Sequence, residues 1–220
     1  MATDIPFKAV IFDMDGTLIA STEADYLAWK RLFAEYGIDL TFENYFPLLG
    51  KKSADVTKYQ LHLTGDDVAE ALQKKLVYFD EVIAENGIQL IPYADVLVKS
   101  VKQYPVKMAL ATSSRKHKME KVMKLVGLLS YFDVTVSGNE IENGKPAPDI
   151  FIEAAERLQV SADECVVFED AASGVQAAKA AGMKCVAITT THPAEALQQA
   201  DMVIDSFEGV DFAQLCQKLK

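Results

Sequence analysis

Six short apolar runs, separated by segments of different pattern, are the feature of this sequence that most constrains its fold. Short continuous apolar runs are typical of strands buried on both faces of a parallel sheet. Parallel strands need long crossover connections, which are usually helical. We therefore predict an α/β fold with a doubly wound, Rossmann-like parallel sheet and right-handed crossovers. The predicted strands are residues 9–12, 108–111, 134–136, 165–168, 185–188 and 202–204.

Helical patterns fill several of the connections between these runs. Residues 116–126 place apolar side chains at helical spacing, and a glycine follows them. Residues 148–158 begin with a proline, which is favoured in the first turn of a helix. Residues 173–181 end at Gly182, and glycine is a common C-terminal cap. The alternation of strand and helix supports the doubly wound sheet.

One long stretch interrupts this alternation. No convincing strand lies between about residues 21 and 87, and residues 68–86 read as one helix among several. An apolar stripe at helical spacing marks another helix, formed by Leu27, Ala28, Leu32 and Tyr36. We read this stretch as a helical bundle inserted after the first strand.

The insertion divides the expected organisation into two domains. We predict a core domain of residues 1–18 and 92–220 and an α-helical cap domain of residues 19–91. The chain crosses between them twice, near Leu18 and Pro92, and two crossings make a plausible hinge.

Composition narrows the expected partners. The net charge is −10, and a diffuse acidic surface repels nucleic acid and anionic membranes, so we expect neither as a partner. No segment approaches the roughly 20 apolar residues of a membrane span, and the N-terminus lacks a secretory pattern. Cys165, Cys185 and Cys216 are odd in number, lack metal-binding spacing and are expected to be reduced core thiols. We expect a cytoplasmic protein that is a monomer or a weak homo-oligomer.

Two aspartates directly follow the first predicted strand. Asp13 and Asp15 alternate with a methionine, so both carboxylates face the same side of an extended segment, and Gly16 permits a sharp turn. Ligands of open parallel sheets bind beyond the carboxyl ends of the strands. Two carboxylates held together repel each other, and a divalent cation with a preference for oxygen ligands, Mg²⁺, resolves that repulsion. The alternative is an Asp-rich turn that caps a helix.

A second acidic pair, Glu169 and Asp170, follows the predicted strand 165–168 at the same edge of the sheet. Together the two pairs are able to enclose one cation and leave room for a phosphate oxygen. The alternative is that Asp170 supplies a negative charge to the N-terminus of the following helix.

Candidate phosphate-binding groups lie in two places, directly after another predicted strand and in a later loop. Thr112, Ser113 and Ser114 come directly after the predicted strand 108–111 and before a helix, where hydroxyl and N–H groups hold phosphate. We expect Thr112 to bind phosphate and Ser114 to cap the helix. Lys145 lies between a glycine and a proline, on a stiff loop that directs its ammonium toward phosphate and nucleophile. The alternative for Lys145 is a solvated surface lysine.

These four elements, in this order, resemble the haloacid dehalogenase superfamily of phosphotransferases. The resemblance covers nearly the whole chain, and the matching residues are Asp13, Asp15, Thr112, Lys145, Glu169 and Asp170. The insertion is similar to the α-helical cap of the subgroup that contains beta-phosphoglucomutase and many sugar-phosphate phosphatases.

The resemblance implies a role for each residue. Asp13 would attack phosphorus and form an aspartyl-phosphate, and Asp15 would protonate the leaving oxygen and then deprotonate water. Lys145 and Thr112 would hold the phosphoryl oxygens. Magnesium would be placed by Asp13, Glu169, Asp170 and the backbone carbonyl of Asp15. True dehalogenases lack an aspartate two positions after the first, so Asp15 favours phosphate chemistry.

The acceptor of the phosphoryl group is less constrained. Beta-phosphoglucomutases carry a histidine where this chain has Asp25, and a Lys-Gly-x-x-Arg loop where it has residues 49–53, Leu-Gly-Lys-Lys-Ser. We expect Asp25 to repel a phosphate in the cap. The sequence therefore favours a phosphatase that acts on a small phosphorylated metabolite, such as a sugar phosphate. The alternatives are a sugar phosphomutase and a non-catalytic phosphate-binding module.

Overall fold

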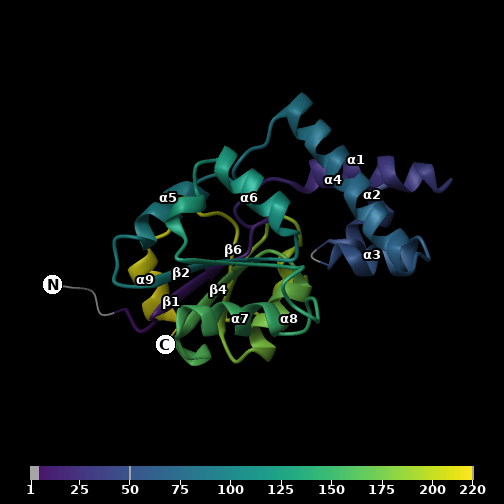
Figure 1. The fold of residues 1–220 in the computed structure, drawn as a ribbon. Helices are drawn as coiled ribbons and strands as arrows, with labels where there is room; N and C mark the ends of the chain where they lie inside the picture. Colours follow the sequence, from purple (N-terminus) through teal and green to yellow (C-terminus); the bar gives the residue numbers. More distant parts are fainter. Residues whose placement is uncertain (1–4, 50, 220) are drawn as a thin grey trace.

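The computed structural model describes residues 5–49 and 51–219. Within these residues, six parallel strands form one sheet in the order β3-β2-β1-β4-β5-β6 (Figure 1). The strands are β1 (Ala9–Phe12), β2 (Lys107–Thr112), β3 (Val134–Ser137), β4 (Cys165–Glu169), β5 (Lys184–Ile188) and β6 (Met202–Ile204). Each predicted strand is found, and the predicted fold class is confirmed.

The register brings three strand ends level with one another. Phe12, the last residue of β1, pairs with Leu110 of β2 and with Phe168 of β4. Because all three strands run in the same direction, the residues that follow them meet at one edge of the sheet. This edge holds the polar residues that the sequence singled out.

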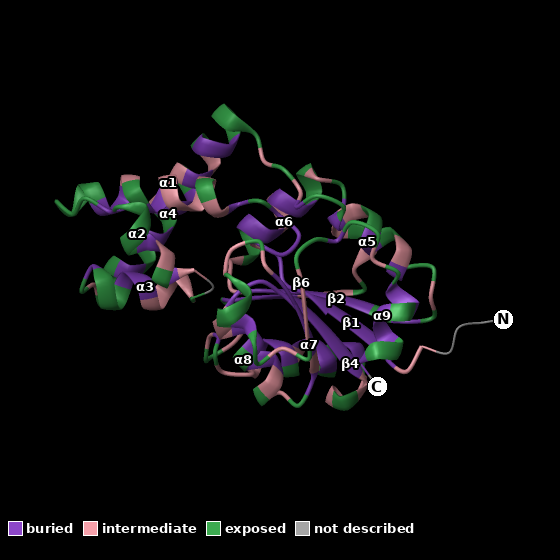
Figure 2. Ribbon diagram, turned by 180° about the vertical axis from the view of Figure 1, so that it is seen from behind, coloured by how far each residue is buried: buried purple, intermediate pink, exposed green. Residues whose placement is uncertain are grey.

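Helices cover both faces of the sheet, and side chains of β1 alternate between the two layers. Ala9 and Ile11 pack with α7 (Asp149–Leu158) and α8 (Ala172–Ala180). Val10 and Phe12 face the opposite layer. That layer contains α5 (Ala94–Val101), α6 (Lys116–Leu125) and α9 (Phe212–Lys218). The sheet is therefore buried on both faces, as Figure 2 shows, which explains the continuous apolar runs.

Helices of the insertion form a separate group beside the sheet (Figure 1). They are α1 (Thr22–Glu35), α2 (Phe42–Tyr45), α3 (Ser53–Gln60) and α4 (Asp66–Asn86), with a 3-10 turn at Phe46–Leu48. Residues such as Trp29, Leu32 and Phe33 build an apolar core within this group. Phe79 and Ile83, near the end of α4, instead join the core beneath the sheet. The insertion is thus packed both on itself and on the core.

The two segments that lead into and out of the insertion pair with each other. The N–H of Ala20 donates to the Gln89 carbonyl at 2.9 Å, and the N–H of Ile91 donates to the Leu18 carbonyl at 2.9 Å. These bonds hold both connections side by side at the edge of the sheet.

Some details differ from the sequence expectations. Tyr36 ends the first insertion helix as its C-terminal cap and is 40% exposed, so it does not belong to the buried stripe. Helices α5 and α9 had not been predicted. Asp211 caps α9 by accepting a hydrogen bond from the N–H of Gln214. An aspartate in this position is also common in turns, so it does not by itself predict a short helix.

Within the described residues, each of the three cysteines is a buried free thiol, as expected. Among the same residues, no helix combines the length and apolar character that crossing a membrane requires. The cytoplasmic location and the oligomeric state stay predictions.

Candidate active site

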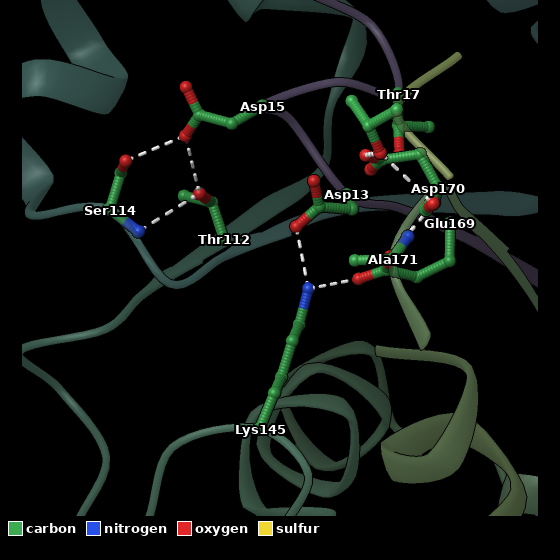
Figure 3. Close-up of polar contacts among 10 residues, drawn as sticks. Asp13, Asp15, Thr17, Thr112, Ser114, Lys145, Glu169, Asp170 and Ala171 are labelled. Atoms are coloured by element: carbon green, nitrogen blue, oxygen red, sulfur yellow. Dashed lines mark hydrogen bonds and ion pairs between the residues drawn. The ribbon is translucent and has the colours of Figure 1, made fainter. Parts of the chain in front are cut away.

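The structure brings all the predicted site residues together around one cavity of about 60 Å³ between the sheet edge and the insertion. Its lining includes Asp13, Asp15, Thr112, Ser113, Lys145, Glu169 and Asp170. Figure 3 shows how most of these side chains converge from separate strand ends.

Asp13 lies where β1 ends, with its N–H donating to the Phe168 carbonyl at 3.0 Å. Its carboxylate is buried and accepts a hydrogen bond from Lys145 Nζ at 2.6 Å (Figure 3). Burial raises the pKa of Asp13 well above its ordinary value, and the carboxylates of Glu169 and Asp170 act in the same direction. Lys145 opposes the shift, since an adjacent ammonium favours the ionised carboxylate.

Lys145 reaches the site from the loop before α7. Its ammonium is buried and donates to Glu169 as well as to Asp13, and it lies 5.0 Å from the centre of the Phe151 ring. Burial lowers the pKa of Lys145, but the two carboxylates outweigh burial, so the pKa lies above its ordinary value. Lys145 is therefore a fixed cation rather than a solvated surface side chain.

Glu169 and Asp170 are buried at the end of β4. Glu169 Oε2 accepts the backbone N–H groups of Asp170 at 2.8 Å and Ala171 at 2.9 Å. Asp170 accepts hydrogen bonds from the hydroxyls of Thr17, at 2.8 Å, and Thr191. Burial, together with the charge of Glu169, raises the pKa of Asp170 to about 7. The helix α8 begins at Ala172 and has no side-chain capping bond, so the Asp170 carboxylate lies next to the helix start but bonds to Thr17 and Thr191.

Two glycines make room for this acidic pair. A Cβ at Gly174 would overlap the carboxylate of Glu169, and a Cβ at Gly16 would overlap the carboxylate of Asp170. Gly16 also has a φ of +87°, a conformation that side chains with a Cβ rarely adopt. Glycine is thus required at both positions by the close approach of a carboxylate.

Asp15 is held by donors from three directions. Ser21 donates to it at 2.5 Å, Ser114 at 2.6 Å and Thr112 at 3.4 Å, and the ammonium of Lys118 lies 2.7 Å away. Burial raises the pKa of Asp15, but the ion pair with Lys118 outweighs it, so the pKa lies below its ordinary value.

The expected helix cap by Ser114 is wrong. Arg115 is the N-terminal cap of α6, without a side-chain capping bond, and the Ser114 hydroxyl turns to Asp15 instead. Thr112 Oγ1 accepts the Ser114 N–H at 3.0 Å, which fixes the turn after β2. Ser113 lines the cavity and its carbonyl lies against Gly138.

The donor chemistry of the site suits a divalent cation. Asp13, Glu169 and Asp170 are three buried carboxylates, and among the described residues Lys145 is the cation that pairs with two of them. Raised pKa values at Asp13 and Asp170 express this excess of negative charge. Across residues 5–49 and 51–219, no group of three or more acidic, histidine or cysteine side chains is arranged closely enough to hold a metal ion. The excess of negative charge therefore fits Mg²⁺. In this structure the carboxylates of Asp13 and Glu169 bond to Lys145, and that of Asp170 bonds to hydroxyl groups.

A buried charge network that sequence reasoning missed adjoins Asp15. Asp25 accepts from Lys75 and, at 2.9 Å, from Lys118, and it also receives Trp29 Nε1 at 3.1 Å. Two ammonium groups therefore balance Asp25, and the expectation that it repels a phosphate in the cap does not follow from the structure. Trp29 and Lys75 reach Asp25 within the insertion, whereas Lys118 reaches it because the insertion packs against α6, a contact that residue spacing does not reveal.

Comparison with known proteins places the chain in a family. The model of the haloacid dehalogenase-like hydrolase family matches residues 10–188. Fructose-1-phosphate phosphatase YqaB of Escherichia coli is 32% identical to the chain, over 82% of the chain and 95% of that protein. Protein SUPPRESSOR OF QUENCHING 1, chloroplastic, of Arabidopsis thaliana is 40% identical over 84% of the chain, which spans only 18% of that longer protein.

A crystal structure of beta-phosphoglucomutase from Clostridium difficile superposes with a TM-score of 0.87 and 26% identity. The match covers 97% of this chain and 97% of that one, so both the sheet and the insertion are shared. The chain belongs to the haloacid dehalogenase-like hydrolase family.

Proposed function

We propose that this chain is a magnesium-dependent phosphatase that hydrolyses a small phosphorylated metabolite, a sugar phosphate, through an aspartyl-phosphate. The observation that carries the proposal is the buried carboxylate of Asp13 at the end of β1, 2.6 Å from Lys145 and beside the cavity that Asp15 also lines. Phosphoryl transfer depends mainly on such positioning and on charge neutralisation.

Asp13 and Asp15 divide the chemistry between them. A carboxylate oxygen of Asp13 attacks phosphorus, and the bond from phosphorus to the leaving oxygen breaks as that oxygen takes a proton from Asp15. Asp15 must therefore take up a proton from solvent as substrate binds, against the ion pair with Lys118 that lowers its pKa in this structure. Asp15 then takes a proton from water, whose oxygen attacks the same phosphorus and returns Asp13 as a carboxylate. Lys145 and Thr112 hold the phosphoryl oxygens, and Ser113 lines the same cavity.

Magnesium completes the charge balance of the site. We assign its ligands to Asp13, Glu169, Asp170 and the backbone carbonyl of Asp15. When bound, the cation neutralises the negative charge that phosphate and these carboxylates bring together.

We further propose that residues 19–91 act as a cap domain on a core of residues 1–18 and 92–220. Residues 1–4 and Gly50 of these ranges lie outside the described residues. One water-sized group needs about 10–15 Å³, so a cavity of about 60 Å³ holds roughly four to six such groups. That space suits a phosphate, and we propose that movement of the cap provides the further room that a sugar phosphate needs.

The substrate class draws on the relatives as well as on the site. The Escherichia coli relative is named for fructose 1-phosphate, and the Clostridium difficile structure for a phosphoglucomutase. A cap that encloses the site excludes large phosphoproteins and suits small sugar phosphates.

A panel of phosphorylated metabolites tests this function. The purified chain, with Mg²⁺, is scored for phosphate release, and beta-glucose 1-phosphate with a trace of the bisphosphate is included. Release of free phosphate supports the phosphatase, whereas glucose 6-phosphate without free phosphate would identify a mutase. An absence of both across the whole panel would favour a non-catalytic phosphate-binding module.

A further inference from the structure

The cluster of Asp25, Lys75 and Lys118 joins the insertion to the core with buried charges. Asp25 comes from α1, Lys75 from α4 and Lys118 from α6. Lys118 Nζ lies 2.9 Å from Asp25 and 2.7 Å from Asp15, so one ammonium bridges the two carboxylates. Both lysine side chains are at least 95% buried. Buried charges of this kind are retained only where they are paired and hydrogen-bonded.

Each charge of the cluster is held by more than its ion pair. Asp25 Oδ2 accepts from Trp29 Nε1 and from the Tyr45 hydroxyl, each at 3.1 Å. The Lys75 ammonium lies 5.1 Å from the Trp29 ring centre, and the Lys118 ammonium 4.5 Å from that of Phe79. These contacts fix the direction of Asp25 and Lys118 toward the cavity.

The residues of the cluster differ in whether they line the cavity. Asp15, Asp25, Trp29 and Lys118 line the cavity, whereas Lys75 is not part of its lining. In the proposed chemistry the leaving oxygen of the substrate comes to Asp15. Atoms attached next to that oxygen then fall beside Lys118, which is 2.7 Å from the Asp15 carboxylate, and beside Asp25 beyond it.

We propose that Lys118 and Asp25 form a subsite for the leaving alcohol of the substrate. Lys118 donates to an oxygen on the carbon next to the ester carbon, and Asp25 accepts from the hydroxyl hydrogen of the same or the next carbon. Lys75, Trp29 and Tyr45 act as positioning residues that hold Asp25. The inference rests on the proposed phosphatase function and adds that the enzyme recognises the leaving alcohol of its substrate.

The charge of the cluster narrows the substrate class further. The exposed Lys51 also lines the cavity, outside this cluster. Within the cluster, Asp15 and Asp25 are balanced by Lys75 and Lys118, so the subsite itself has no spare positive charge for a second phosphate. It suits a neutral polyol, with hydroxyl groups that both donate and accept. The expected substrates are monophosphates of neutral, polyhydroxylated alcohols with a hydroxyl adjacent to the ester carbon.

Glycerol 1-phosphate and n-propyl phosphate are the probes that test this subsite, since they share a three-carbon chain and differ in the hydroxyl groups. We expect the parent enzyme to prefer glycerol 1-phosphate in kcat/KM by about 10-fold to 100-fold, the range of a hydrogen bond to a charged partner. The Lys118→Met variant, which keeps the aliphatic stem, removes the preference by losing activity on glycerol 1-phosphate. Its activity on n-propyl phosphate also falls, because Lys118 pairs with Asp15, but it falls less than the activity on glycerol 1-phosphate.

Lys121→Met is the matched control. Lys121 lies on the same helix and also pairs with the insertion, through Asp80 at 2.8 Å, but it does not line the cavity. This control keeps the preference of the parent. Lys118→Arg, which retains a donor and a charge, restores part of the preference that Lys118→Met loses.

Three results would overturn the subsite. Equal losses on both substrates in Lys118→Met would mean that Lys118 acts through Asp15 or the fold and not on the leaving alcohol, and a preference that survives in this variant would place the recognition elsewhere. A parent enzyme that cleaves p-nitrophenyl phosphate but shows no preference between the two probes would refute the subsite without using a variant. A parent that cleaves none of the three esters would instead refute the phosphatase function on which the inference rests.

Discussion

The surroundings of Asp13 distinguish it from an ordinary surface aspartate. It is buried, it shares the cavity with Glu169 and Asp170, and Lys145 contacts it. The same three carboxylates explain why a cation fits the site and why glycine is needed at positions 16 and 174. The fit to a cation and the need for glycine are thus two consequences of one concentration of charge.

The Asp13→Asn variant removes the nucleophile while keeping the shape of the side chain. We expect turnover to fall by at least about 10³-fold, as losses of catalytic nucleophiles do. Thermal unfolding should be unchanged or shifted upward, because one of three crowded carboxylates is lost. Phosphate release and circular dichroism measure the two effects, and activity within a few-fold of the parent would refute the covalent mechanism.

The Gly174→Ala variant tests the close approach to Glu169. The added Cβ overlaps the carboxylate, so Glu169 must move and its bonds to the Asp170 and Ala171 N–H groups are disturbed. We expect a loss of about 100-fold in kcat/KM, which corresponds to about 3 kcal/mol. Gln176→Ala, exposed on the same helix, is the control and should keep full activity. Equal activity of the two variants would show that Glu169 is not constrained by Gly174.

Residues that end the strands could be predicted as a group from the sequence. Asp13, Asp15 and Glu169 follow apolar runs, and the edge of a parallel sheet brings such residues together. The partners of Asp15 could not be predicted in the same way. Lys118 lies one residue from the apolar stripe of its helix, and it meets Asp25 only because the insertion packs over α6.

Elements of the core were easier to predict than the way the insertion meets it. The strands are short apolar runs because both faces of the sheet are buried. The contact between the start of α3 and the core includes the side chain of Lys52, the N-terminal cap of this helix. Lys52 Nζ donates to the carbonyls of Ile141 at 2.9 Å and Glu142 at 3.0 Å, in the loop that leads to Lys145. Gly144 allows this approach, because a Cβ there would lie 2.8 Å from Lys52 Cβ.

The Lys52→Met variant tests whether this contact holds the insertion against the core. Loss of two partly exposed hydrogen bonds removes about 1 kcal/mol, which shifts an equilibrium between closed and open forms about fivefold. We expect a KM about fivefold higher and a larger radius of gyration by small-angle X-ray scattering. Lys58→Met, an exposed lysine on the same helix, should change neither quantity. A KM and radius unchanged in Lys52→Met would assign the closed arrangement to other contacts.

The whole molecule combines a net charge of −10 with a site for anionic substrates. Three of its cations, Lys145, Lys118 and Lys75, are buried around the cavity or directly behind it, and the exposed Lys51 also lines the cavity. Fixed internal charges thus replace a basic surface as the source of attraction for phosphate, and the proposed Mg²⁺ adds to them.

Stability of the metal-free protein should depend on pH through the same carboxylates. Burial, reinforced by Glu169, raises the pKa of Asp170 to about 7, so the folded state keeps a proton that the unfolded state releases above about pH 4. Its contribution to the free energy of unfolding therefore falls as pH rises from about 4 to about 7. Mg²⁺ should raise the melting temperature more at about pH 8 than at about pH 6, where protons compete with it.

Thermal unfolding with Mg²⁺ or with a chelator, at both pH values, measures this difference. The Asp170→Asn variant should lose most of the response to Mg²⁺. A response of equal size at both pH values, or one that persists in this variant, would argue against Asp170 as a ligand.

The central claim is that the phosphoryl group passes through Asp13, and trapping the intermediate tests it most directly. The enzyme is mixed with Mg²⁺ and a substrate found in the metabolite panel, quenched in acid during turnover and digested for peptide mass spectrometry. The account predicts one added phosphoryl group on the peptide that contains Asp13, and none in the Asp13→Asn variant. Turnover with no phosphorylated peptide, or with the phosphoryl group on another residue, would contradict it.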